Sequence, residues 1–456
     1  MDHVFRLKPF VNEYDWGKRK QTSLVYKLFK QYINSENDLD SDRRYSELWI
    51  GTHPSGPSTL LPLRDYNFTG VILDDLEDSS ALSQQSKDSI YLGKNIGYLS
   101  DILKKFYLEK YKIENKSLKI LFKVLSIDRP LSLQMHPDVQ NAVNLFQRNH
   151  PSIVDQCSKP EMFIALTEFS AIIGMRSIES IFKYITKYSE FAEIIGIYLI
   201  NEIKSLLELD PNTLSGLIYI KLIRKILATP SVDLLSTLIN EIENEKTRDL
   251  AEEFVLILNR NCGYDICIIF PFIMNCIRVD KGTAIFIPPN TIHSYIYGNC
   301  VEIMKNSDNV IRLGLTSKIT DPELCIELME SNVATNEPIG HLHYVYPESV
   351  STFTFKYQPT HGSCNFIAWS IIIPSGNTDI IALSNNDNIF LAIIIDTNPL
   401  VFMSVISPSS NFTEENKVGI EHTVIGDCFL FLPETKLEIH NNGKSDFIMY
   451  ITSEHQ

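Results

Sequence analysis

The chain has 456 residues, 44% of them hydrophobic and 21% charged, with a mean hydropathy of −0.03. These values are ordinary for a globular protein and exclude a wholly disordered chain, and the length favours two or three domains. The formal net charge of −15 at pH 7 disfavours binding to nucleic acid or to an anionic membrane, because such a surface repels both. We therefore expect neither kind of partner.

The N-terminal residues and the cysteines bear on the compartment. The first residues lack the basic segment and the apolar stretch of a secretory signal, and no apolar run approaches the ~18 residues that a membrane-spanning helix needs. The eight cysteines are scattered without a C-x-x-C pair, which favours reduced thiols over a disulfide framework. These features predict a cytoplasmic protein.

Polar segments and apolar runs alternate in the N-terminal third. Residues 34–44 and 76–96 are rich in Ser, Asp and Asn, which is typical of surface loops. Residues 119–127 (KILFKVLSI) and 131–135 (LSLQM) are rich in large and β-branched apolar side chains and indicate strands. The intervening DRP predicts a turn, so we expect these two strands to form a hairpin.

A helical segment follows. From residue 177 to about residue 260, apolar residues recur every three or four positions, which predicts helices. Pro211 and Pro230 interrupt this pattern, and Asn261 to Gly263 closes it as a helix stop. We expect a helical insert domain over residues 177–262.

Strands return after the helices. The runs FIMNCIRV and TAIFIPPN are joined by DKG, which predicts a second hairpin. From about residue 345 to the end, short apolar runs are separated by turn residues, as in a β-sandwich or barrel. The predicted fold is therefore mainly β with a helical insert.

Candidate metal ligands lie at the edges of the predicted strands. Gln134 and His136 share one face of a strand because side chains alternate, and Glu161 begins another apolar run. With His293, they supply two imidazoles and two oxygen donors, which suit a borderline divalent metal with an open position for water or substrate. Each also has an ordinary explanation: a hydrogen-bonded structural histidine, a hairpin glutamine, or a carboxylate that is solvated or paired with Lys159.

The segment before His293 favours the metal interpretation. Gly282, five residues, Pro288 and then His293 match a metal-binding pattern of the cupin β-barrel. Asn290 stands where that pattern has glycine, and asparagine tolerates the left-handed backbone conformation.

Five blocks of the chain together resemble the type I mannose-6-phosphate isomerase family. The most specific contain SLQMHPD, KPE and SDNVIRLGLT. The helical segment is not covered, and the C-terminal third matches mainly in length and β character. The blocks are NEYDWGK (12–18), ELWIGTHPSGPS (47–58), LFKVLSIDRPLSLQMHPD (121–138), KPEMFIALTEF (159–169) and residues 287–318.

The resemblance implies a zinc isomerase that interconverts mannose 6-phosphate and fructose 6-phosphate through a cis-enediol, supplying mannose for GDP-mannose and glycan synthesis. It implies one Zn²⁺ per chain, held by Gln134, His136, Glu161 and His293. The implied architecture is two cupin-type jelly-roll β-barrels plus an all-α domain. The expected domains are residues 1–176 and 263–335 (catalytic cupin), 177–262 (helical insert) and 336–456 (a second cupin-like domain without metal).

The resemblance also implies further site residues. Arg312 is expected to hold the phosphate or stabilise an enediolate, and its alternative is a buried ion pair with Asp308. Ser132 is expected in the substrate pocket, and Lys159 has both catalytic and substrate-binding roles. The other expected catalytic residues are Asp308, Glu302 and Tyr295.

Some assignments stay open on the sequence. The proton-transferring base is left among Asp308, Glu302 and Lys159, and Tyr295 has a strong alternative as a packed tyrosine. Val139 replaces the family lysine of HPDK, with an expected effect on phosphate affinity.

Three other classes of protein compete with the isomerase. A sugar-phosphate-binding cupin without catalysis is disfavoured by the retained charges at 159, 308 and 312. A metal-dependent oxygenase normally has a site richer in histidine. A bifunctional enzyme of mannose metabolism is disfavoured because no Gly-rich nucleotide-binding start is visible. No heptad or apolar edge strand marks an interface, so we expect a monomer.

Overall fold

The structure is a computed structural model, and it divides by internal packing into two compact units. The first unit comprises residues 1–126, 301–306 and 345–456, and the second comprises residues 127–300 and 307–344. The described residues are 4–33, 40–62, 97–111, 117–208, 215–229, 231–334, 341–383, 388–406 and 417–455. Most of the predicted loop 34–44, the whole loop 76–96, Pro211 and Pro230 lie outside these ranges.

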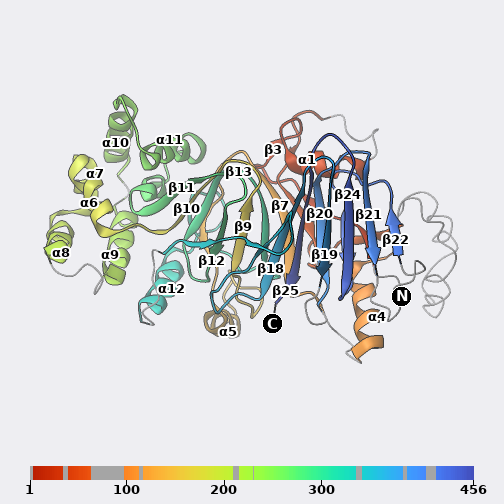
Figure 1. Ribbon diagram of the computed structural model, residues 1–456. Coiled ribbons are helices and arrows are strands. Elements are labelled where there is room, and N and C mark those ends of the chain that lie inside the picture. The colour runs from red at the N-terminus through yellow and green to blue at the C-terminus, as the bar shows by residue number, and fades with distance from the viewer. Residues whose placement is uncertain are drawn as a thin grey trace. The chain divides into compact units, whose positions relative to one another are not determined.

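Two antiparallel sheets in the first unit are built mostly from its C-terminal residues, with the N-terminal strands β1 and β6 at one edge (Figure 1). Their inward side chains, among them Trp369, Phe390 and Leu437, share one hydrophobic core. Along β24 buried and half-buried residues alternate, as in a sheet with one solvated face. One sheet has the order β16 (Glu348–Ser349), β17 (Thr354–Tyr357), β18 (Phe366–Ile373), β25 (Phe447–Glu454), β20 (Phe390–Asp396), β23 (Cys428–Phe431), β1 (Val4–Lys8), β6 (Thr59–Leu61), and the other β19 (Asn377–Leu383), β24 (Thr435–Asn441), β21 (Val401–Ile406), β22 (Lys417–Ile420).

The rest of the first unit is shorter strands and helices. Strand β5 (Glu47–Ile50) lies between β2 (Phe10–Asn12) and β7 (Ile120–Ile127) in antiparallel register. The remaining elements are β3 (Lys18–Arg19), α1 (Leu24–Phe29), η1 (Lys30–Tyr32), β4 (Arg44–Tyr45) and α4 (Leu99–Tyr111).

The second unit contains the strands that carry the candidate ligands. Strand β8 (Leu133–Met135) pairs with β13 (His293–Lys305) and with β14 (Ile311–Gly314). Strand β9 (Glu161–Ala165) pairs with β12 (Ala284–Ile287), and β10 (Phe169–Met175) pairs with β11 (Met274–Val279) and β13. The other elements here are α5 (Val139–Gln147), η4 (Ile266–Phe272), α12 (Pro322–Ala334) and β15 (His343–Val345), whose last residue belongs to the first unit.

Helices occupy the described part of the predicted helical segment and gather beside β10 and β11 (Figure 1). Their apolar faces share one hydrophobic core with Leu133, Met135 and Ile172 on the strands. The last helix stops at Gly263, as predicted, and this glycine has a positive φ of 66°. The helices are α6 (Ile178–Lys187), α7 (Ser189–Ile195), α8 (Ile197–Glu208), α9 (Ser215–Leu227), α10 (Val232–Asn244) and α11 (Leu250–Cys262).

Both predicted hairpins are wrong. The runs before and after DRP do form the strands β7 and β8, but β7 pairs with β5, and β8 pairs with β13 and β14. Similarly, β11 pairs with β10 while β12 pairs with β9. A turn does join β11 and β12, since the Thr283 N–H donates to the Asp280 carbonyl, but the backbone groups of these strands bond to strands far away in the sequence.

The cysteines are unpaired, as predicted, and Cys267, Cys300, Cys325 and Cys428 are buried. Burial raises the pKa of the Cys276 thiol to about 12, so this thiol is protonated at neutral pH. Among the described residues, none of the helices is long and apolar enough to cross a membrane.

Candidate metal centre

The register of three short strands brings predicted ligands together. Gln134 of β8 lies directly opposite His293 of β13 and, on the other side, opposite Arg312 of β14. Residues opposite each other in an antiparallel pair project to the same face, so these three side chains form a row. The neighbours Leu133 and Met135 point the other way, into the hydrophobic core, which fixes the face of Gln134.

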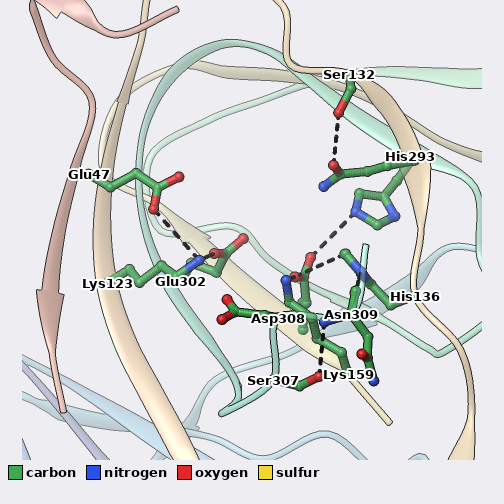
Figure 2. A network of polar contacts seen from close by, with 12 residues as sticks. Glu47, Lys123, Ser132, His136, Lys159, His293, Glu302, Ser307, Asp308 and Asn309 are labelled. Atoms are coloured by element: carbon green, nitrogen blue, oxygen red, sulfur yellow. Dashed lines mark hydrogen bonds and ion pairs between the residues drawn. The ribbon is translucent and has the colours of Figure 1, made fainter. Parts of the chain in front are cut away.

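The carboxylate of Glu161, the first residue of β9, lies between the imidazoles of His136 and His293. Figure 2 labels the two histidines. The Nε2 atom of His136 is 3.2 Å from its Oε1, and the Nε2 atom of His293 is 3.4 Å from its Oε2. One donor atom of each residue lies within 4.8 Å of the others, as one metal ion requires. All three side chains are nearly inaccessible to solvent, with exposures of 1–3%.

The proton positions on the imidazoles favour a cation. The Nδ1 atoms of His136 and His293 lie 2.7 Å and 2.9 Å from the backbone carbonyls of Asn309 and Thr291, so each Nδ1 carries the donated proton. Each Nε2 then presents a lone pair toward the carboxylate, and neither Nε2 has a hydrogen-bond partner among the residues that the structure describes. Two lone pairs and one carboxylate facing each other in a buried site are satisfied by a bound cation.

The pKa shifts agree with this donor set. Burial, reinforced by the charge of Lys159, lowers the pKa of His136 to about 4, so this imidazole is neutral at physiological pH. Burial by itself raises the pKa of Glu161, but the interactions with His136, His293 and Lys159 outweigh burial and hold that pKa well below its usual range. The site therefore offers a neutral His136 nitrogen and an ionised Glu161 oxygen, the forms that bind metal.

The predicted ligand Gln134 is held by a predicted substrate residue. The Ser132 hydroxyl donates to the Gln134 Oε1 at 2.9 Å (Figure 2 shows Ser132 near His293). This bond turns the amide oxygen toward Ser132, and an amide oxygen has a second lone pair for a metal. The structure thus places Ser132 beside the ligand set.

Lys159 and Tyr295 also lie beside the ligands. Lys159 is buried, and its Nζ is 3.7 Å from the Glu161 Oε1, so the alternative ion pair proposed for this carboxylate is present. Tyr295 follows His293 on β13, is buried, and packs edge-on against Phe163 and Phe169. These aromatic contacts agree with the alternative given above for Tyr295, a packed tyrosine with a structural role.

The remaining predicted residues of this unit differ in exposure. Asp308 is exposed, and its backbone N–H donates to the Asp155 Oδ2 at 3.1 Å. Arg312 is half-buried opposite Gln134, and its carbonyl accepts the N–H of Asp321. The strand register thus places the Arg312 side chain on the same face of the sheet as Gln134 and His293.

Glu302 belongs to the first unit, in the last third of β13. It is buried and forms an ion pair of 3.2 Å with Lys123 of β7, whose Nζ is also 3.8 Å from Glu47. The Trp49 indole donates to Glu47, which completes the network. Lys123 was not among the predicted residues, although a single charge inside the apolar run ILFKVLSI is the signal that could have found it.

The sequence of the chain is similar to those of known proteins. The family model "Phosphomannose isomerase type I, catalytic domain" matches residues 4–178. The chain is 32% identical to Mannose-6-phosphate isomerase 1 of Arabidopsis thaliana over 98% of its own length and 92% of that protein. It is 31% identical to the Homo sapiens Mannose-6-phosphate isomerase over 71% and 72% of the two chains.

The fold is also similar to solved structures. A zinc-bound crystal structure of mannose 6-phosphate isomerase is similar over 100% of both chains, with a TM-score of 0.68 and 19% identity. A crystal structure of a mutant phosphomannose isomerase from Salmonella typhimurium has the same coverage, TM-score and identity. The similarity to these structures shows the fold. Membership of the family rests on the relatives that are similar in sequence.

Proposed function

The chain belongs to the mannose-6-phosphate isomerase family, and on this premise we propose that it interconverts D-mannose 6-phosphate and D-fructose 6-phosphate with one zinc ion per chain. The observation that carries the proposal is the buried group His136, Glu161 and His293, whose two Nε2 atoms face one carboxylate and have no hydrogen-bond partner in the described part of the chain. Such a group is costly unless a cation is bound.

The donor set fits zinc. His136 and His293 supply imidazole nitrogens, Glu161 supplies a charged oxygen, and the Gln134 amide oxygen is the proposed fourth ligand. When bound, zinc acts as a Lewis acid toward an oxygen of the sugar. The structural neighbour with bound zinc supports this choice of metal.

The roles proposed for the chain's other residues follow from charge and position. Arg312, on the same face as Gln134, is proposed to hold an anionic oxygen of the substrate, either the phosphate or the developing enediolate. Ser132 orients Gln134, and Lys159 adds positive charge beside Glu161. Tyr295 forms an apolar wall beside His293.

The base that moves the proton between C1 and C2 through a cis-enediol is proposed to be Asp308, Glu302 or Lys159. A general base must reach the carbon-bound proton and have a pKa near neutral. Asp308 is exposed, whereas Glu302 and Lys159 are buried next to opposite charges. Mutating each in turn, with measurement of exchange of the C2 proton with solvent, separates the candidates.

We also propose the finer architecture and setting implied by the family. These are two jelly-roll barrels, an all-α insert with the domain boundaries given above, and no metal in the second barrel. A monomeric, cytoplasmic enzyme that supplies mannose for GDP-mannose and glycan synthesis completes the proposal. Sedimentation and zinc stoichiometry test the monomer and the single metal.

The direct test is isomerisation of mannose 6-phosphate by the purified protein before and after chelation, with zinc added back. We expect turnover to disappear with the metal and to return with zinc. Zinc binding without turnover would instead favour a non-catalytic sugar-phosphate-binding protein. In that case Val139→Lys, which restores the family charge at the exposed first residue of α5, is the next variant to assay.

A further inference from the structure

Asn309 is a fully buried asparagine that clamps a neighbouring loop. Its Oδ1 accepts the backbone N–H groups of Val154 at 2.8 Å and Asp155 at 3.2 Å. Its Nδ2 donates to the carbonyls of Asp155 and Cys157, each at 2.9 Å, and to the Asp155 Oδ1 at 3.0 Å. The amide thereby uses both its oxygen and its nitrogen, and the bound loop ends at Cys157, two residues before Lys159.

The reverse contacts make the clamp reciprocal. The Asp155 carboxylate accepts the Ser307 hydroxyl at 3.0 Å and the backbone N–H of Asp308 at 3.1 Å. The Ser307 hydroxyl oxygen in turn accepts the N–H of Asn309 at 3.2 Å. The two segments around residues 155 and 308 therefore hold each other in one conformation.

The same asparagine contacts a metal ligand through its backbone. The Asn309 carbonyl oxygen is 2.7 Å from the Nδ1 of His136, and Figure 2 shows the two residues side by side. This bond keeps the proton on Nδ1 and leaves the Nε2 lone pair for a metal. Asn309 is thus joined to His136 by its main chain and to the segment leading to Glu161 by its side chain.

We propose that Asn309 is the positioning residue of the metal centre: it sets the tautomer and ring orientation of His136 and the placement of Glu161 at the same time. The inference rests on the proposed zinc site. Removing the amide frees the 154–157 loop and lets the carbonyl at 309 shift away from Nδ1. Such partners of ligands typically change metal affinity by about 10–100-fold.

The test is Asn309→Ala, with zinc affinity measured by chelator competition and the absorption spectrum of the Co²⁺-substituted protein as a readout of coordination geometry. We expect about 10–100-fold weaker zinc binding and an altered cobalt spectrum. Unchanged zinc affinity together with an unchanged spectrum would overturn the inference.

The matched control is Asn441→Ala. Asn441 is also fully buried, and its Nδ2 donates to the Ile373 and Ser445 carbonyls in the first unit. We expect a comparable fall in the denaturant midpoint for both variants, but wild-type zinc affinity for Asn441→Ala alone. An equal loss of zinc affinity in the control would show that Asn309 acts only through overall stability, which contradicts the proposal.

A measurement on the wild-type protein covers the case in which Asn309→Ala does not fold. Long-range ¹H–¹⁵N NMR on the zinc-free, histidine-labelled protein reports the tautomer of His136, with His136→Gln used for assignment. We expect the proton on Nδ1, and a proton on Nε2 would refute the positioning role.

Failure of the proposed function is distinguishable from failure of this inference. If the wild-type protein binds zinc but does not isomerise the sugar phosphates, only the proposed isomerase function is overturned. The role of Asn309 is tested by the zinc affinity and by the tautomer of His136, and neither depends on turnover. A wild-type protein that binds neither zinc nor cobalt overturns both.

Discussion

At the scale of single residues, the site is defined by where its protons lie. His136 and His293 each donate from Nδ1 to a backbone carbonyl, which turns both Nε2 atoms toward Glu161. Because burial keeps His136 neutral, the carboxylate is the negative member of the metal-binding group. The charge of Glu161 and the protonation of His136 can each be changed by one substitution or by pH.

Glu161→Gln is expected to abolish zinc binding. The amide keeps the size of the side chain but removes the only negative charge among the four proposed ligands. We expect zinc affinity to fall by more than about 100-fold, which exceeds the effect of losing a partner of a ligand. Elemental analysis after dialysis measures it, together with the isomerase rate.

The matched control for this variant is Glu168→Gln. Glu168 is exposed, and its Oε1 is 3.8 Å from the Nε of Arg278. Retention of one zinc per chain in both variants would remove Glu161 from the ligand set.

The zinc-free protein is expected to lose stability as the pH falls from about 6.5 to about 4. The pKa of His136 is about 4 in the folded protein against 6.5 for a free imidazole, so in this window the unfolded chain takes up a proton that the folded chain does not. The free energy of unfolding therefore decreases with decreasing pH, by on the order of 3 kcal/mol for this group. Urea unfolding at several pH values measures the slope.

His136→Gln is the comparison for the pH series. It lacks the titrating imidazole, so its stability should depend less steeply on pH between 6.5 and 4. Parallel curves for the two proteins would mean that His136 is not the source of the slope.

At the scale of elements, a turn and a strand register place the ligands. Asn290 has a φ of 58°, and its backbone N–H donates to the carbonyl of His136. Its Nδ2 donates to Asp138 at 2.8 Å and to the Asn332 Oδ1 at 3.1 Å. Asn290 therefore adopts the left-handed backbone conformation for which the cupin pattern uses glycine, and its side chain adds hydrogen bonds that glycine cannot make.

Asn290→Gly is expected to lower the free energy of unfolding by about 1–2 kcal/mol, because it loses only the amide hydrogen bonds. Asn290→Ala should cost about 1 kcal/mol more, since alanine is strained in the left-handed conformation. Denaturant midpoints of the zinc-free variants measure both differences.

Asn149 is the control for the backbone contribution. It also has a positive φ, of 53°, but its side chain is exposed. The difference in free energy of unfolding between the alanine and glycine variants should be similar at both positions. The decrease in that free energy from asparagine to glycine should appear at position 290 only. An equal loss at 149 would show that the amide contacts of Asn290 contribute nothing.

At the scale of the whole molecule, packing divides the chain differently from composition. The predicted domain boundaries at 176, 262 and 335 follow changes between strand-like and helix-like sequence, and they stay predictions. The two compact units instead alternate along the chain, and β13 begins in the second unit and ends in the first. All four proposed zinc ligands lie in the second unit.

Zinc is therefore expected to stabilise the second unit selectively. A ligand that binds only the folded site raises its unfolding free energy by RT ln(1 + [L]/Kd), which is about 2.7 kcal/mol at 100 times Kd. We expect zinc to slow amide hydrogen exchange in β8, β9 and β10, with little change in β18, β20 and β25. Mass spectrometry of peptides from protein with and without zinc measures this.

The Glu161→Gln protein serves as the control, since zinc should leave its exchange unchanged. Equal slowing in both units of the wild type would show instead that the molecule opens as one cooperative body.

The sequence by itself determined the chemistry and the local conformations. Metal ligands are limited to a few side-chain types, so Gln134, His136, Glu161 and His293 were recognisable, and the structure brings the two histidines and the glutamate together. Asn290 takes the left-handed conformation that the sequence allowed for it, and Gly263 follows the last residue of α11 as the predicted helix stop, because backbone sterics act within one residue.

Tertiary structure alone decided which distant segments meet. Strand pairing depends on partners remote in the sequence, so β7 and β8 did not form the expected hairpin. Lys123 and Asn309 gained their roles for the same reason. Neither residue type is distinctive by itself, and each acts through contacts with segments more than 100 residues away along the chain.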